Sequence, residues 1–136
     1  MSDKIPDNVI AESLALINFD SAGLVPAIAQ QYDTGENLMM AWMNADAVRE
    51  TLTTGRVCYW SRSRQKLWRK GESSGQVQTL IDFRIDCDGD TILLCVDQTG
   101  VACHTGRGNC FFYAVRTGGI ETIADVEIDP GDLYGK

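Results

Sequence analysis

Polar and hydrophobic residues alternate along much of this chain, and the alternation predicts more strand than helix. Within the stretch 76–86, Ile81, Phe83 and Ile85 alternate with charged residues, which is the pattern of a strand with one buried face. Further apolar runs are bounded by turn-forming residues such as Asp, Gly and Asn, and each is expected to be a strand. These runs lie at 24–32, 38–43, 56–61, 91–97 and 110–116.

Two segments carry helical signals instead. Asn44 is a suitable N-cap, Asp46 lies in a first turn where the helix dipole favours an acidic residue, and Gly55 can end a helix in the left-handed conformation. A short helix is therefore expected over 45–54, and a second one over 9–19. Together with the strands, these helices predict a small, strand-rich α+β domain.

Length and composition place the chain among ordinary globular proteins. Its 136 residues correspond to one domain, 1–136. No apolar run approaches the roughly 18 residues of a membrane span. The N-terminal residues are acidic and are not followed by an apolar stretch, so no secretory signal is expected. These observations favour a cytoplasmic protein without a membrane partner.

Charge is distributed unevenly along the chain. The net charge of −7 argues against nucleic acid or an anionic membrane as a partner. The stretch 56–70 nevertheless contains six Lys and Arg residues and no acid, which leaves −13 for the remaining 121 residues. Such local basicity favours a compact anionic ligand, although a solvated basic face explains an isolated charge run equally well.

A run of acidic residues follows the strand expected at 76–86. Asp86, Asp88 and Asp90 are separated by single residues, so on an extended chain their carboxylates point to the same side and Cys87 points to the other. Crowded carboxylates repel one another unless a hard cation such as Mg²⁺ lies between them. The alternative is an acidic hairpin tip without a metal.

Five cysteines suggest metal chemistry rather than disulfide bonds, because their number is odd and no export signal precedes them. Cys87, Cys103 and Cys110 form a soft set of three donors suited to Zn²⁺, and three protein ligands leave one position for water. Cys58 and Cys95 lie in apolar runs and are expected to be small core residues.

The lone histidine and the basic stretch supply the remaining candidate groups. His104 follows Cys103 in a polar, Gly-rich loop over 100–109, a context that suits a general base beside a metal. Arginine forks bind phosphate, and serine hydroxyls add donors; Trp60 and Trp68 could stack on a base or pack in the core. The residues expected to bind substrate are Trp60, Arg62, Ser63, Arg64, Lys70, Glu72, Ser73 and Ser74.

These motifs occur in one order that resembles the phosphoribosyl-AMP cyclohydrolase family over about 24–116. The motifs are Trp-Met-Asn at 42–44, the block Tyr-Trp-Ser-Arg-Ser-Arg to Gly-Glu-Ser-Ser-Gly at 59–75, Asp-Cys-Asp-Gly-Asp at 86–90, and Cys-His-Thr-Gly ending at Cys110. The resemblance implies an intertwined homodimer of small α+β subunits. It also implies zinc on Cys103, Cys110 and Cys87 of the opposite subunit, and magnesium on Asp86, Asp88 and Asp90.

The function implied by the resemblance is zinc-dependent hydrolysis of 1-(5-phosphoribosyl)-AMP, a phosphorylated nucleotide, in histidine biosynthesis. Water adds to C6 of the adenine ring and the N1–C6 bond breaks, with His104 as the expected general base. Some relatives carry a fused pyrophosphohydrolase domain. The chain ends about 20 residues after Arg116, so this second activity is expected to be absent.

Two other functions remain open at this point. A non-catalytic zinc module that binds RNA or protein predicts a fourth protein ligand on the metal, and the acidic net charge counts against it. A zinc deaminase predicts release of ammonia, but the chain lacks the H-x-E and P-C-x-x-C signature of that class.

Overall fold

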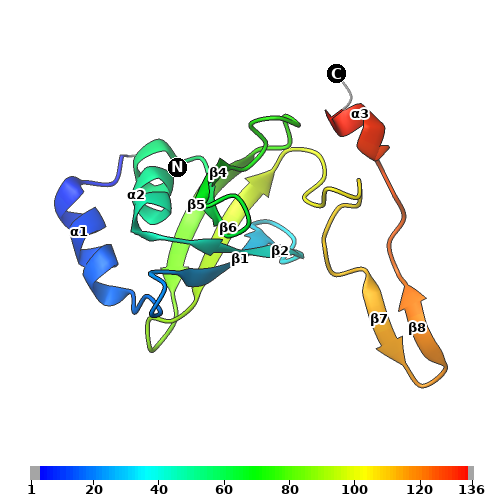
Figure 1. Cartoon of the computed structure of the whole chain (residues 1–136), viewed down its shortest axis with the longest axis horizontal. Coiled ribbons are helices and arrows are strands. Elements are labelled where there is room, and N and C mark those ends of the chain that lie inside the picture. The colour runs from blue at the N-terminus through cyan, green and yellow to red at the C-terminus, as the bar shows by residue number, and fades with distance from the viewer. Residues whose placement is uncertain (1–3, 135–136) are drawn as a thin grey trace.

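The computed structural model describes residues 4–134, and six of its strands form one mixed sheet in the order β4-β3-β2-β1-β6-β5 (Figure 1). Two further strands, β7 and β8, pair as a separate hairpin. The strands are β1 Val25–Gln31, β2 Asn37–Met43, β3 Cys58–Ser61, β4 Lys66–Arg69, β5 Gln78–Ile85, β6 Ile92–Gln98, β7 Tyr113–Arg116 and β8 Gly119–Thr122, and the helices are α1 Asp7–Leu16, α2 Ala45–Thr54 and α3 Pro130–Tyr134.

The six-stranded sheet curls so that its edge strand β5 approaches the residues just before β3. Strands β1 and β6 are parallel, and the other neighbours are antiparallel. The Val57 amide donates to the Gln78 carbonyl (3.0 Å) and the Leu80 amide donates to the Gly55 carbonyl (2.8 Å). Because these bonds join the chain before β3 to β5, the sheet is partly closed. The expected strand-rich α+β class is confirmed.

The core lies between the curled sheet and the two helices α1 and α2, which pack on each other at one side of it (Figure 1). Helix α2 has the predicted bounds and caps: the Asn44 side chain accepts from the Ala47 amide (2.8 Å), and Gly55 adopts φ 75°. Cys58 and Cys95 are buried, which confirms that they are core residues.

Several expected elements differ from the observed ones. The strand pattern at 76–86 placed Ile81 on the buried face, and this was wrong: a β-bulge between Leu80 and Asp82 leaves Ile81 39% exposed and Leu80 fully buried. The inserted residue shifts the alternation by one position. The segment expected as a strand at 110–116 is a strand only from Tyr113, and β4, β8 and α3 were not predicted.

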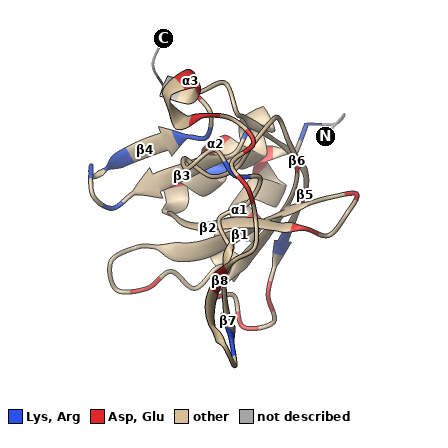
Figure 2. Cartoon of the chain, turned by 90° about the vertical axis from the view of Figure 1, so that its right-hand side faces the viewer, with Lys and Arg blue, Asp and Glu red and all other residues tan. Residues whose placement is uncertain are grey.

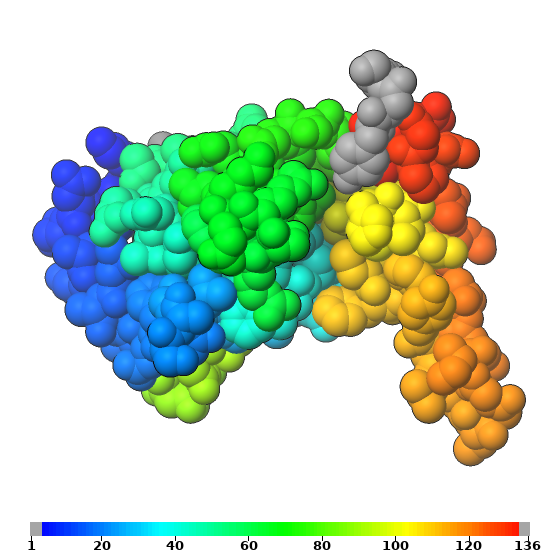
Figure 3. Space-filling view, in the orientation of Figure 1, coloured from blue at the N-terminus to red at the C-terminus, as the bar shows by residue number. Residues whose placement is uncertain are grey.

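The β7–β8 hairpin extends away from the rest of the molecule (Figures 1 and 3). All four residues of β8 are exposed, and apolar side chains on both strands face solvent, with Val115 at 81%. Within the described residues, no helix or sheet packs over these apolar side chains as α1 and α2 pack on the main sheet. A two-stranded hairpin is only marginally stable by itself. No helix within residues 4–134 combines the length and apolar character needed to cross a bilayer.

Candidate functional site

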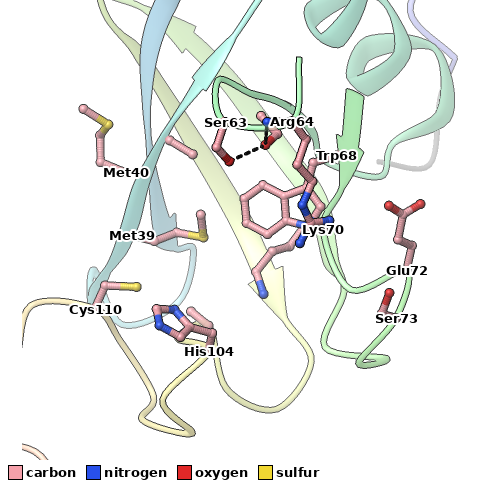
Figure 4. A pocket seen from close by; sticks show the side chains of 13 residues that line it. Met39, Met40, Ser63, Arg64, Trp68, Lys70, Glu72, Ser73, His104 and Cys110 are labelled. Carbon is pink, nitrogen blue, oxygen red and sulfur yellow. Dashed lines mark hydrogen bonds between the residues drawn. The ribbon is translucent and has the colours of Figure 1, made fainter. Parts of the chain in front are cut away.

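A cavity of about 640 Å³ lies where β2, the β3–β4 hairpin, the loop after β4 and the loop after β6 approach one another (Figure 4). It contains several of the groups predicted from the sequence, contributed by segments far apart along the chain. Its lining residues are Met39, Met40, Ala41, Ser61, Ser63, Arg64, Trp68, Lys70, Glu72, Ser73, Ala102, His104 and Cys110.

The Gly-rich loop brings two of the predicted metal ligands together. The Cys103 amide donates to the Arg107 carbonyl (3.2 Å) and the Gly106 amide donates back to the Cys103 carbonyl (3.0 Å), which folds the loop tightly. The Cys110 amide donates to the Leu38 carbonyl of β2 (2.7 Å). As a result, Cys103 and Cys110 lie close enough for each thiol to shift the pKa of the other.

The two thiols of this pair differ in how readily they ionise. Burial opposes ionisation of Cys103, but hydrogen bonds from the Thr105 hydroxyl (3.1 Å between Oγ1 and Sγ), the Thr105 amide and Cys110 outweigh it and lower the pKa of Cys103. Desolvation and the neighbouring charge of Cys103 raise the pKa of Cys110 to about 12. Cys103 therefore ionises more readily than Cys110, and the two sulfurs form a soft donor pair that a Zn²⁺ ion would fit.

Lys70 places a buried positive charge at the cavity. The residue is 7% exposed, and burial lowers the pKa of its ammonium, while the charges of Cys110 and Cys103 oppose that change. Its Nζ atom lies 6.0 Å from the centroid of the Trp68 ring. Within residues 4–134 it forms no ion pair with a carboxylate. A buried ammonium without an anionic partner is costly, so the cavity is suited to an anion.

His104 lines the same cavity and lies beside Cys110 in the close view (Figure 4). It is exposed, unlike its neighbour Cys103. An exposed imidazole at the rim of a cavity can exchange protons with water inside it. The position of His104 is therefore compatible with the general-base role expected from the sequence.

Five of the eight residues expected to bind substrate line the cavity, namely Ser63, Arg64, Lys70, Glu72 and Ser73. Figure 2 shows Lys and Arg gathered along β4 and its turn. Ser74 lines a neighbouring cavity of about 580 Å³, which also contacts Glu72 and Ser73.

The remaining two expected residues lie away from the cavity of one chain. Trp60 pairs with Trp42 across β2 and β3, and the Arg62 guanidinium lies 4.7 Å from the centroid of the Trp42 ring. Neither Trp60, on β3, nor Arg62, in the turn after β3, lines the cavity.

The sequence indicated only one part, Trp68, of the apolar wall of the cavity. Met39 and Met40 from β2 and Trp68 from β4 form it, and the Trp68 ring also packs on Tyr59 with centroids 5.4 Å apart. Trp68 had a recognisable signal, since an aromatic residue inside a basic block can stack on a base. The two methionines had none, because they resemble core residues of an ordinary strand.

The acidic residues converge as expected, but far from the cavity. Asp86, Asp88 and Asp90 lie in the β5–β6 turn and place carboxylate oxygens within 4.8 Å of one another. Burial opposes ionisation of Asp86, but hydrogen bonds with Asp90 and from the Thr91 amide lower its pKa, whereas contact with Asp88 and Asp86 raises the pKa of Asp90. Carboxylates this close repel one another, and a divalent cation between them would relieve the repulsion.

Cys87 is exposed and separated from the other predicted zinc ligands. In one chain, the single group of three or more His, Cys, Asp or Glu found among residues 4–134 at metal-binding distances is the aspartate cluster. Cys87 belongs neither to it nor to the pair Cys103 and Cys110. In Figure 1 the β5–β6 turn lies below α1, whereas the loop after β6 lies at the opposite end, toward the hairpin.

Comparison with known proteins gives consistent results across the chain. A family model described as "Phosphoribosyl-AMP cyclohydrolase" matches residues 39–112. The chain is 62% identical over 134 residues to a protein of that name from Magnetococcus marinus, covering 98% of this chain and 99% of the relative. It is 68% identical over 126 residues to a protein of the same name from Paramagnetospirillum magneticum, covering 93% and 96%.

Proposed function

The chain belongs to the phosphoribosyl-AMP cyclohydrolase family, and we propose that it opens the adenine ring of 1-(5-phosphoribosyl)-AMP by hydrolysis of the N1–C6 bond, as a zinc-dependent enzyme of histidine biosynthesis. One observation carries the proposal. The thiol of Cys110, the imidazole of His104 and the buried ammonium of Lys70 line one cavity with an apolar wall, and Cys103 lies beside Cys110. Such a cavity can hold the adenine base against its apolar wall, and its positive charge can bind the phosphates of the substrate.

The donors fit zinc if a second copy of the chain supplies Cys87. Cys103 and Cys110 provide two sulfur ligands, and within residues 4–134 no third Cys, His or carboxylate of the same chain lies close enough to join them. With Cys87 of a second chain, the site would have three sulfur ligands and no fourth protein ligand. Catalytic zinc sites typically have three protein ligands in the same way. Zinc bound there would supply Lewis acidity, which makes water more acidic. We place Mg²⁺ at Asp86, Asp88 and Asp90.

The protein groups around the cavity divide the remaining work. His104 accepts the proton of the attacking water, which raises the nucleophilicity of its oxygen toward C6. Lys70 and Arg64 bind phosphate, and the hydroxyls of Ser63 and Ser73 add donors. The apolar wall holds the adenine ring and keeps bulk water away.

Three other expected residues lie outside this arrangement in a single chain. Ser74 reaches the neighbouring cavity, while Trp60 pairs with Trp42 and the Arg62 guanidinium lies over the Trp42 ring. A role of Trp60 and Arg62 in substrate binding stays a prediction. Glu72 lines both cavities, and a carboxylate there suits the ribose hydroxyls of the substrate.

The homodimer is supported by the incomplete site and by the hairpin. The β7–β8 hairpin exposes Tyr113, Val115 and Ile120 (Figure 3), and apolar side chains gathered on a projecting element favour contact with another protein surface. We propose that this surface is a second copy of the chain, whose Cys87 completes the thiol set. The assembly would then contain two equivalent sites.

The test is turnover of the N1-phosphoribosyl nucleotide by the purified protein, followed by its ultraviolet spectrum. We expect ring opening that is lost with a zinc chelator and restored by added Zn²⁺, with no ammonia released. Release of ammonia would instead identify a deaminase. Full turnover after complete removal of zinc would contradict the metal-dependent mechanism.

A further inference from the structure

The β5–β6 turn must hold its side chains in a fixed position if Cys87 is to act at the site of another chain. Inside the turn, the Gly89 amide donates to the Asp86 carbonyl (3.2 Å), and the Asp90 amide donates to the Asp86 carboxylate (2.9 Å). These bonds shape the turn but do not fix its direction relative to the body. Within residues 4–134 the Cys87 thiol makes no hydrogen bond, so the turn alone determines where it points.

Asn18, just after α1, fixes that direction. Its side-chain Nδ2 donates to the Asp88 carbonyl (2.6 Å), and its backbone amide donates to the Gly89 carbonyl (2.8 Å). Two consecutive peptide groups of the turn are therefore bound by one residue that lies 70 positions earlier in the sequence.

The glycine in the turn allows this close approach. Gly89 is buried with φ +76°, and a Cβ at this position would overlap the Leu16 carbonyl oxygen at the end of α1. The turn thus contacts the helix end directly. The helix is itself anchored, because Ile10 and Ile17 belong to the hydrophobic core. Asn18 consequently connects an exposed turn to the rigid interior.

We propose that Asn18 is a positioning residue for Cys87, holding the thiol where the site of a second chain needs it; this rests on the proposed zinc site. Asn18 lies outside the residues 39–112 matched by the family model. It touches neither metal nor substrate, so it acts only through the backbone of the turn. Partners that orient a metal ligand typically change metal affinity about 10–100-fold when they are lost.

The first experiment compares Asn18→Ala with Ser13→Ala in the full-length protein. Ser13 lies on α1 and donates only to the Val9 carbonyl (2.9 Å), so it controls for changes in the helix. Zinc affinity, measured by competition with a chromophoric chelator, is expected to fall at least about tenfold in Asn18→Ala and to stay unchanged in Ser13→Ala. Unchanged zinc affinity in Asn18→Ala would overturn the proposal.

Two more substitutions at this position keep the test valid if Asn18→Ala folds poorly. Asn18→Asp has the same shape but cannot donate to the Asp88 carbonyl, so it should lose zinc affinity as well. Asn18→Ser retains a short donor and should recover part of it. A ranking in which Asn18→Asp binds zinc as tightly as the parent protein would contradict the role of the Nδ2 hydrogen bond.

Combination with Cys87→Ser separates this inference from the proposed function. If Cys87→Ser alone leaves zinc affinity unchanged, Cys87 is not a ligand and the proposed zinc site is wrong. If Cys87→Ser weakens zinc, then adding Asn18→Ala to it should cause no further loss, because the residue acts through Cys87. An equal further loss in the double variant would show a general structural effect and would overturn the positioning role.

A mixed dimer tests the action between chains. When Asn18→Ala chains are co-expressed with differently tagged Cys103→Ala chains, one site combines the intact turn of the second chain with the intact Cys103 and Cys110 of the first. We expect one zinc ion of parental affinity per mixed dimer. A mixed dimer that binds zinc only as weakly as Asn18→Ala would contradict positioning in trans.

Discussion

The two loops that carry the predicted zinc ligands are built in opposite ways. The loop after β6 is folded on itself and mostly covered, although His104 and Cys110 are exposed. Cys103 is 4% exposed, and the amides of Glu127 and Ile128 both donate to the Gly106 carbonyl (2.8 and 3.1 Å). The β5–β6 turn instead exposes Asp86, Cys87, Asp88 and Asp90 and is held at its base by Asn18.

This difference indicates a division of roles between the two ends of one subunit. The covered loop carries the thiol pair and lines a cavity that can bind a ligand within the same chain. The exposed turn instead presents Cys87 to solvent, where it can reach the site of a second chain. Changes in the covered loop should therefore abolish function within the same chain, whereas changes around the turn should act on a neighbour.

The largest effect is expected from removing a ligand in the covered loop. Cys103→Ala should eliminate both zinc retention and detectable ring opening, because Cys103 is one of the proposed zinc ligands and the more readily ionised thiol of the pair. Metal content by atomic emission and turnover by ultraviolet absorbance measure the two losses. Cys95→Ala, a buried thiol on β6, is the matched control and should retain both. Turnover by metal-free Cys103→Ala would contradict the assignment of the metal site to the covered loop.

The next largest effect is expected at His104, on the same loop. His104→Ala should lower kcat by roughly 10²–10⁴-fold, the usual contribution of a general base, while zinc content stays unchanged, because the imidazole is not one of the proposed ligands. Steady-state kinetics and metal analysis on the same sample distinguish the two. A decrease in kcat of less than about threefold would assign His104 a structural role instead.

Lys70 should separate binding from stability. Lys70→Met should lower kcat/KM by roughly 10²-fold because a buried charge partner of the substrate is lost. Urea unfolding at pH 7 should show no loss of stability, because burial already disfavours the ammonium. Arg49→Met on α2, which is exposed, changes the net charge equally and should leave kinetics unaffected. Strong destabilisation by Lys70→Met would show that its charge supports the fold.

The smallest effect is expected from an ion pair that joins α2 to the β3–β4 hairpin beside the cavity. Glu50 on α2 accepts two hydrogen bonds from Arg69 (2.7 and 2.8 Å), and these lower the pKa of Glu50 below its ordinary value of 4.5. A carboxyl group with a lowered folded-state pKa stabilises the protein above its unfolded pKa, and this contribution is lost as the pH falls through the folded pKa.

Glu50→Gln should therefore lower Tm at pH 7 by roughly 2 °C, and the difference from the parent should disappear as the pH falls below about 4.5. Thermal unfolding at pH 7 and pH 3 measures it. Zinc affinity should stay unchanged, in contrast to Asn18→Ala. A difference in Tm that persists at pH 3 would mean that packing, and not charge, explains the loss.

Local signals explain which parts of the fold could be predicted. Helix α2 was predicted with its exact bounds because Asn44 and Gly55 each carry their capping signal within a few residues. The bulge at Ile81 depends on the partner strand β6, which sequence alternation does not reveal. Strand β4 was missed because its Lys and Arg residues mask a short pairing with β3.

The site shows the same limit at a larger scale. Cys103, Cys110 and His104 were predicted to act together, and the structure places Cys110 and His104 at one cavity with Cys103 close enough to shift the pKa of Cys110. Residue spacing could not predict the wall formed by Met39 and Met40, because it depends on how β2 passes the loop after β6. Nor could it place Trp60 and Arg62, whose direction follows from the pairing of β3.

The position of Cys87 at the far end of the subunit also affects how the metal is retained. In the proposed assembly each zinc ion is held by two polypeptides, so its affinity is tied by mass action to the association of the chains. Dilution would release metal as subunits separate, and abundant enzyme would hold zinc more tightly than scarce enzyme. Metal occupancy would then report the concentration of the protein itself.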